Sequence, residues 1–355
     1  MERVFPSCRS EAPFRKFYSV GVNIRKEEKY KIMKRAGIGV ALVLLVLSVA
    51  SLIPGRAQEA NAPPKAGGPP PANPLKVALL KWYPANQTTS FKVGKSPLEV
   101  AFDGANIWVV NSGDSTLHKL RASDGATLGK FNVGASYGVA FDGANIWATR
   151  YDDRVAKVRA SDGALLGTYG VGKSPFWLAF DGANIWVANE GENTVSKLRA
   201  SDGANLGTFT VNTAPLGVAC DGENIWVTTL GGNSVTKLRA TDGTVLGTFA
   251  VGSQPYGVAF DGASIWVANR GDGTVTKLRS SDGAKLGTFY VGFAYGIAFD
   301  GANIWVTGGE EVEILRPSDG TILVQIHESG EPTGLAFDGA NMWVAMYDSG
   351  AVLKM

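Results

Sequence analysis

The chain has 355 residues and a formal net charge of +2, but its charges are unevenly distributed. Residues 1–35 hold 10 lysines and arginines against 4 acidic residues, whereas residues 75–355 hold 22 basic and 27 acidic residues. The excess of acidic residues in the larger part excludes nucleic acid as the expected partner, because nucleic acid requires a basic face. The two cysteines are Cys8 and Cys220, so residues 75–355 cannot form an internal disulfide.

The N-terminal part divides into a basic leader, residues 1–35, and an apolar segment, residues 36–58. Ala36–Ile53 contains 18 residues without a charge, and the small residues Gly55 and Ala57 follow it. This pattern predicts a secretory signal peptide. An uncleaved membrane anchor is the alternative, because 18 residues is near the lower limit of a membrane span. Both readings place the rest of the chain outside the cytoplasmic membrane, and the sequence leaves Met1 and Met33 open as translation starts.

Residues 59–74 form a segment rich in proline, alanine and glycine. It contains Pro63-Pro64 and Pro69-Pro70-Pro71 and few large apolar side chains. Such a composition cannot bury a core and favours an extended, semi-rigid chain. The sequence therefore predicts a linker between the apolar segment and a domain at residues 75–355.

A segment close to Phe-Asp-Gly-Ala-Asn-Ile-Trp occurs seven times in residues 75–355. Its tryptophans follow one another at intervals of 38 to 40 residues and are Trp108, Trp147, Trp186, Trp226, Trp266, Trp305 and Trp343. A period of about 40 residues, filled with short β-rich runs and turn dipeptides, is typical of propellers in which each repeat forms one four-stranded blade. The fold class is therefore all-β, and the architecture is a seven-bladed β-propeller.

Each repeat alternates short apolar runs with turn residues. One copy predicts strands at Tyr256–Phe260, Ser264–Asn269, Thr274–Arg279 and Lys285–Val291. An Asp-Gly pair separates the first two strands and another separates the last two. Glycine reaches positive φ without a Cβ clash and the aspartate accepts a local backbone N–H, so turn chemistry explains these pairs. The calcium loop pattern is absent, and we expect no metal site here.

The two ends of the domain complement each other. Pro332–Met355 supplies a first, second and third strand and stops before a fourth. Thr89–Val93 aligns with a fourth strand, so it should complete the last blade and close the ring without an open edge. Val77–Lys81 resembles Val352–Met355, and the sequence leaves open which of the two forms the third strand.

The repeats resemble a known group of proteins. The sequence Ile-Trp-Val-Ala-Asn-x-Gly-x-x-Thr-Val-x-Lys-Leu, at Ile185–Leu198 and Ile265–Leu278, is similar to YVTN-type β-propeller repeats and to virginiamycin B lyase-like propellers. The group includes surface proteins, binding modules and a lyase that opens a cyclic antibiotic ester. The lyase resemblance would imply a histidine general base and acidic residues that hold Mg²⁺. The chain has two histidines, His118 and His327, and we expect both on outer strands.

A ligand surface is expected at the mouth of the central channel. The loops that join fourth to first strands, and second to third strands, differ between copies, whereas the Asp-Gly turns hardly change. A site on a repeat scaffold needs unlike side chains from successive copies. Glu99 and Trp177 stand where five other copies have glycine. The candidate ligand-binding residues are Glu99, Tyr137, Arg150, Tyr151, Asp152, Phe176, Trp177, Glu190, Tyr256, Arg270, Tyr295, Glu310, Tyr347 and Asp348.

These residues favour a binding or interaction module over an enzyme. A mixed aromatic and charged surface suits a protein, a peptide or a small amphipathic ligand. We identify no catalytic residue and expect no cofactor, with Mg²⁺ required only if the protein is a lyase. A structural cell-surface repeat protein is a further alternative. The domain is expected to be monomeric and extracytoplasmic, and to meet a membrane only through its N-terminal segment.

Overall fold

The computed structural model describes residues 88–355. The predicted leader, signal peptide or anchor, and linker lie outside the described residues, as does Val77–Lys81. No helix within residues 88–355 is both long and apolar enough to span a membrane.

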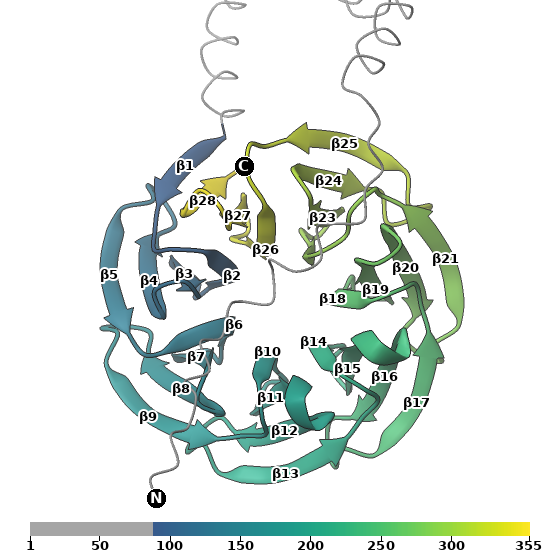
Figure 1. The fold of residues 1–355 in the computed structure, drawn as a ribbon, viewed down its shortest axis with the longest axis horizontal. Coiled ribbons are helices and arrows are strands. Elements are labelled where there is room, and N and C mark those ends of the chain that lie inside the picture. Colours follow the sequence, from purple (N-terminus) through teal and green to yellow (C-terminus); the bar gives the residue numbers. More distant parts are fainter. Residues whose placement is uncertain (1–87) are drawn as a thin grey trace, which may run out of the picture. The chain divides into compact units, whose positions relative to one another are not determined.

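The described residues form seven four-stranded antiparallel sheets, arranged as the blades of one ring (Figure 1). Blade 1 contains β2 (Pro97–Phe102), β3 (Asn106–Asn111), β4 (Thr116–Arg121) and β5 (Thr127–Asn132). Blade 2 contains β6 (Ala135–Phe141), β7 (Asn145–Arg150), β8 (Arg154–Arg159) and β9 (Leu165–Gly170). Blade 3 contains β10 (Pro175–Phe180), β11 (Asn184–Asn189), β12 (Thr194–Arg199) and β13 (Asn205–Thr210). Blade 4 contains β14 (Pro215–Cys220), β15 (Asn224–Thr229), β16 (Ser234–Arg239) and β17 (Val245–Ala250). Blade 5 contains β18 (Pro255–Phe260), β19 (Ser264–Asn269), β20 (Thr274–Arg279) and β21 (Lys285–Tyr290). Blade 6 contains β22 (Ile297–Phe299), β23 (Ile304–Gly308), β24 (Glu311–Leu315) and β25 (Ile322–His327). Blade 7 contains β26 (Pro332–Phe337), β27 (Met342–Met346), β28 (Ala351–Lys354) and the N-terminal strand β1 (Thr89–Lys92). Two short 3-10 helices, η2 (Glu190–Glu192) and η3 (Leu230–Gly232), follow the second strands of blades 3 and 4. The predicted seven-bladed propeller is confirmed.

The N-terminal strand closes the ring. β1 pairs antiparallel with β28, with Thr89 opposite Lys354 and Lys92 opposite Ala351. The third strand of the last blade is therefore β28, which settles the question that the sequence left open. Phe91 of β1 stacks on Trp343 at a centroid distance of 5.5 Å. The last blade thus has a complete outer strand, as the sequence predicted.

Each repeated tryptophan is fixed by the aspartate of its own first turn. In blade 4, the Trp226 indole N–H donates to Asp221 Oδ2 at 2.7 Å, while Asp221 Oδ1 accepts the backbone N–H of Asn224 at 2.7 Å. The same indole-to-aspartate bond occurs in all seven blades. The interpretation of these aspartates as turn residues was right but incomplete, because their second oxygen orients the core tryptophan.

A lysine joins each such tryptophan to the next blade. Lys237 Nζ lies 5.0 Å from the Trp226 ring centroid and donates to the Ser280 carbonyl of blade 5 at 2.7 Å. Equivalent lysines lie over the tryptophan in every blade except blade 6, where Ile314 pairs with Trp305. In blade 7 the third and fourth strands, β28 and β1, come from opposite ends of the described residues, so no hairpin among them offers carbonyls to a lysine from blade 6. An apolar residue at position 314 avoids an unsatisfied ammonium group.

Removal of residues 75–94 should open the ring. The deletion takes away β1, exposes an edge of β28 and uncovers the apolar side of Trp343. We expect a loss of several kcal/mol in the free energy of unfolding and aggregation of the deleted protein. Deletion of residues 1–60 is the control and should leave the melting temperature unchanged. Equal melting temperatures for both deletions would contradict closure by β1.

Replacement of Trp226 should damage the joint between blades 4 and 5. The indole is fully buried and packs with Val235, Ile265, Val267 and Leu278. Trp226→Ala should lower the free energy of unfolding by about 3–5 kcal/mol, measured by chemical denaturation. An exposed-residue control, Tyr290→Ala, should change it by less than about 0.5 kcal/mol. If Trp226→Ala were as stable as the wild type, Trp226 would not be a core residue of this joint.

Candidate functional site

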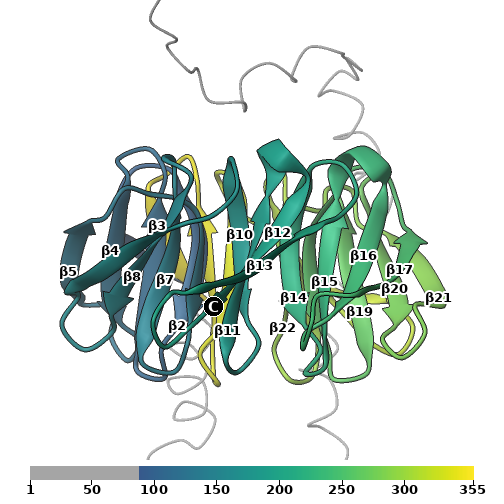
Figure 2. The same ribbon diagram turned by 90° about the horizontal axis from the view of Figure 1, so that it is seen from below.

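The variable loops gather on one face of the ring. In each of several blades, the loop after the second strand donates backbone hydrogen bonds to the loop before the first, as from Gly271 N to Ser253 O at 2.9 Å and from Glu190 N to Ser174 O at 3.1 Å. The Asp-Gly turns join the first strand to the second and the third to the fourth, so they lie at the opposite ends of the same strands. Figure 2 shows the ring from the side, with loops at both of its faces. We call the surface of the variable loops the mouth face.

Six aromatic rings form one continuous cluster in the mouth face. This aromatic network consists of Tyr137, Tyr151, Phe176, Trp177, Tyr256 and Tyr295. Phe176 stacks on Tyr137 at 4.5 Å, and Trp177 meets Tyr256 edge-on at 5.2 Å and Tyr295 at 6.1 Å. The residues come from blades 2, 3, 5 and 6, so the network reaches across the central channel.

The network has a buried base and an exposed rim. Phe176, Trp177, Tyr256 and Tyr295 are each less than a tenth exposed, and the Tyr295 hydroxyl donates to the Tyr256 hydroxyl at 3.1 Å. Tyr151 is 53% exposed. Most of these rings therefore pack against one another, and a ligand would meet the network mainly through its rim.

Threonines in alternate blades hold the base of the network. Thr149 Oγ1 accepts the Gly138 N–H at 2.8 Å and donates to the Phe176 carbonyl of the next blade at 3.0 Å. Thr228 bonds in the same way to the Tyr256 carbonyl, at 2.7 Å. These positioning residues were missed in the sequence, although threonine in three copies against valine or alanine in the other four was a visible signal.

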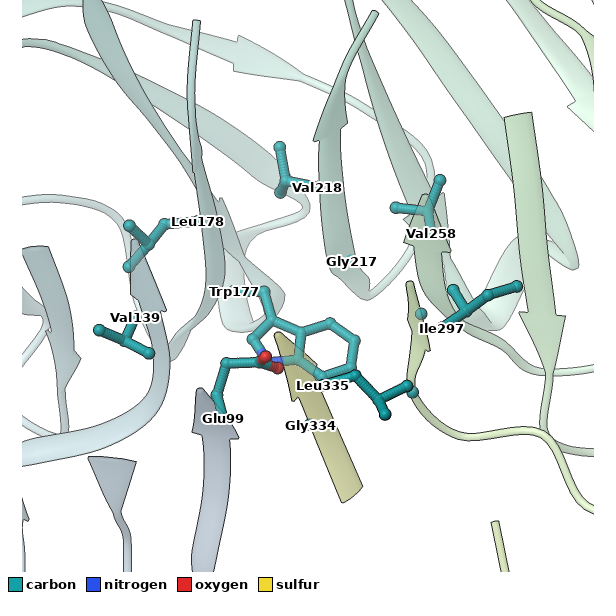
Figure 3. Close-up of a pocket in the computed structure, with 12 residues that line it drawn as sticks. Glu99, Val139, Trp177, Leu178, Gly217, Val218, Val258, Ile297, Gly334 and Leu335 are labelled. Atoms are coloured by element: carbon teal, nitrogen blue, oxygen red, sulfur yellow. The ribbon is translucent and has the colours of Figure 1, made fainter. Parts of the chain in front are cut away.

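Glu99 and Trp177 meet in the channel. The inner strands approach so closely that a Cβ added at Gly217 would lie 2.4 Å from the Tyr256 carbonyl oxygen, which explains glycine in five blades. The two exceptions face each other (Figure 3), and the Glu99 carboxyl accepts hydrogen bonds from the Trp177 side chain and from Val100 N. They line a cavity of about 120 Å³ whose other side chains are Val139, Leu178, Val218, Val258, Ile297 and Leu335.

Burial controls the charge of Glu99. The loss of water around the carboxyl raises its pKa to about 8, and the hydrogen bonds from Val100 and Trp177 oppose this shift only in part. The side chain is half-buried, because part of it faces the cavity. At neutral pH the channel therefore holds a mostly protonated carboxyl that has no cationic partner among the described residues.

Charged residues surround the aromatic network. The Arg270 guanidinium lies 5.9 Å from the Tyr256 ring centroid. Burial raises the pKa of Glu190, and burial followed by repulsion from Asp348 raises the pKa of Glu331, which Arg270 opposes. Glu331 was missed in the sequence, although it precedes the first strand of blade 7 in a mouth loop. Beside the network, the site therefore combines the Arg270 guanidinium with two carboxyls, Glu190 and Glu331, that burial makes easier to protonate.

The remaining candidate residues are only partly brought together. Burial, followed by Tyr151, Glu190 and Tyr347, raises the pKa of Tyr137 to about 12, so these residues are neighbours. Arg150 pairs with Asp152 at 2.8 Å on the same face. Tyr347 and Asp348 also line a second hollow of about 520 Å³ beside Lys92, Lys95 and Lys130, at the ring closure. Glu310 also lies in a mouth loop, that of blade 6, but its carboxyl is directed to the outer strand, 3.5 Å from His327.

His118 lies in the third strand of blade 1 and His327 in the fourth strand of blade 6, both in the outer half of the blade as the sequence predicted. His118 is buried in β4, where burial lowers its pKa, and His327 is exposed in β25. Within residues 88–355 no group of three or more histidine, cysteine, aspartate or glutamate side chains is placed to hold a metal ion. The Mg²⁺ that the lyase resemblance implies stays a prediction that belongs to the lyase alternative alone.

The comparisons with known proteins agree on the fold. No family model and no curated protein matches the sequence. Among solved structures, a streptogramin B lyase is 18% identical with a TM-score of 0.64, over 76% of this chain and 96% of the other. Hydrazine synthase of Kuenenia stuttgartiensis is 18% identical with a TM-score of 0.66, over 75% and 96% of the two chains. BamB from Moraxella catarrhalis is 16% identical with a TM-score of 0.55, over 72% and 83%. The resemblance to lyase-like propellers is thus confirmed at the level of fold, which does not determine activity.

Glu99 should make the stability of the protein depend on pH. An unfolded glutamate ionises near pH 4.5, whereas folded Glu99 ionises near pH 8. Stability is therefore lost as the pH rises from 4.5 to 8 and is constant above. Glutamine does not ionise, so Glu99→Gln removes this loss. The free energy of unfolding of the variant should exceed that of the wild type by an amount that grows with pH, to about 1–3 kcal/mol at pH 8. Chemical denaturation at pH 5, 6.5 and 8.5 tests this, and a difference that is independent of pH would contradict it.

Proposed function

We propose that the protein is an extracytoplasmic binding or interaction module that engages a protein, a peptide or a small amphipathic ligand through its mouth face. The observation that carries the proposal is the aromatic network, in which unlike residues of four blades meet under charged side chains. A repeat scaffold needs no such divergence for stability, because the same joint between blades suffices around the ring. Exposed aromatic rims with a few polar groups are the usual composition of binding surfaces.

The known propellers of similar fold support the proposal only in general terms. They include an enzyme and BamB, so the scaffold accommodates more than one function. The extracytoplasmic location rests on the sequence pattern of residues 36–58, which precedes the domain. The occupant of the mouth face is therefore to be identified by experiment.

Arg270 offers a matched test of the proposal. It lies over Tyr256 on the mouth face, whereas Arg239 pairs with Asp242 at an Asp-Gly turn on the opposite face. The full chain, Arg270→Ala and Arg239→Ala should be compared for ligands captured from an extracytoplasmic extract and identified by mass spectrometry. We expect the Arg270 variant to lose a captured species at least about 10-fold, since a desolvated charged contact is worth 1.5–3 kcal/mol.

The Arg239 variant should retain that species, because the ion pair it loses is solvent-exposed. If both variants lost the captured species equally, its capture would depend on the overall charge of the protein and not on the mouth face. Capture of nothing by the wild type would favour a structural cell-surface protein.

A carbon–oxygen lyase is the second candidate, and Glu99 is the observation in its favour. A carboxyl with a pKa of about 8 can exchange a proton near neutrality, as a general acid or base must. The outer positions of both histidines oppose the histidine-based chemistry of the resembling lyase. Turnover of a cyclic depsipeptide by the wild type, abolished in Glu99→Gln, would replace binding by catalysis as the function of this face.

A further inference from the structure

The two outer strands of blade 6 carry acidic and amide side chains where blade 5 has threonines. Equivalent cross-strand pairs are Thr274 with Tyr290 and Thr276 with Thr288 in blade 5, and Glu311 with His327 and Glu313 with Gln325 in blade 6. Residues two apart on a strand share one face, and facing residues on paired strands are neighbours. Glu311, Glu313, Gln325 and His327 therefore form one surface, the blade 6 patch.

Glu313 lies at the base of this patch with an unsatisfied oxygen. The side chain is 3% exposed, and its Oε2 has no hydrogen-bond partner among the described residues. The exposed Gln325 amide covers it and donates Nε2 to Glu313 Oε1 at 3.0 Å and to Glu311 Oε2 at 2.8 Å. Burial, followed by repulsion from Glu311, raises the pKa of Glu313 to about 7. One neutral amide thus serves two carboxyls, which is poor compensation for a buried acid.

The surroundings add negative charge, and among residues 88–355 no lysine or arginine forms an ion pair with these carboxylates. Glu328 N donates to the Glu310 carbonyl at 2.9 Å, which places two further acidic residues at the mouth end of the patch. Among the described residues, these carboxylates have one ion-pair partner, His327, which lies 3.5 Å from Glu310. The two basic residues of positions 301–355 are engaged elsewhere, Arg316 with the aspartate of its own turn and Lys354 with carbonyls of blade 1.

An exposed aromatic ring lies beside the acidic residues. Phe293 is 60% exposed, and its ring contacts Gly309, which directly precedes Glu310. A Cβ added at Gly309 would lie 2.9 Å from this ring, so the glycine allows it to pack against the loop. Aromatic faces attract guanidinium and ammonium groups and cover the apolar stems of their side chains.

We propose that the blade 6 patch binds an arginine side chain from a basic peptide segment of a partner protein. The guanidinium would displace the Gln325 amide and donate to both carboxylates, including Glu313 Oε2, while its stem covers Phe293. A guanidinium has five N–H donors in a planar fork and can bridge two carboxylates, which a single amide or ammonium does less well. This inference rests on blade 6 alone and is independent of the aromatic network.

The test uses the full chain and a fluorescein-labelled peptide of Gly-Ser-Arg repeats, with binding measured by fluorescence anisotropy. The double variant Glu311→Gln, Glu313→Gln should bind at least about 10-fold more weakly, since hydrogen bonds to charged groups are worth 1.5–3 kcal/mol. The matched control is Glu192→Gln with Glu223→Gln, which removes the same charge from exposed positions in blades 3 and 4 and should change binding less than about 2-fold.

Gln325→Ala separates ligand binding from a merely structural role. Without the amide that competes for the carboxylates, this variant should bind the arginine peptide more tightly than the wild type. A Gly-Ser-Lys peptide of the same length should bind more weakly than the arginine peptide. The proposal would be overturned by no binding to the wild type at millimolar peptide, by equal losses in the two double variants, by weaker binding to Gln325→Ala, or by equal affinity for both peptides.

Discussion

The joint between neighbouring blades is the interaction on which the ring depends. A tryptophan of one blade is oriented by the aspartate of its own turn and packs against apolar residues of the next, as Trp226 does against Ile265 and Val267. A lysine such as Lys237 then covers the indole and bonds to the next blade's backbone. Apart from the side chains that meet across the channel, blades contact their neighbours, so the stability of the ring is approximately the sum of these joints. The mouth loops can therefore vary without loss of the fold.

The inner strands impose a second constraint, and the candidate site arises where the chain departs from it. Backbone approaches as close as that of Gly217 to Tyr256 exclude side chains from most inner positions. Glu99 and Trp177 are the two residues that carry a side chain at this position, and the indole N–H partly compensates the buried carboxyl. A single polar contact thus crosses the channel at a position where the other five blades have glycine.

The sequence predicted the ring well because its information is periodic. The tryptophan spacing specified the blades, and the missing fourth strand of the last repeat identified Thr89–Val93 as its complement. A periodic pattern does not predict contacts between side chains of distant repeats. Glu99 and Trp177 were recognised as exceptions, but their meeting depends on how blades 1 and 3 face each other around the ring. Glu313 escaped notice because a glutamate on an outer strand is usually solvated, whereas this one is buried and bonded to Gln325 of the paired strand.

The closure by β1 also has a mechanical meaning. Every other outer strand is joined to its blade by a hairpin, whereas β1 is held to β28 through four paired residues and side-chain contacts such as Phe91 with Trp343. The adjacent joint, between blades 6 and 7, is the one in which Ile314 replaces the bridging lysine. Any tension transmitted along the polypeptide from residues before position 88 is applied directly to β1. Under such tension β1 would detach from β28 before any other strand pair separates. Loss of β1 would open the ring and so begin the unfolding of the domain.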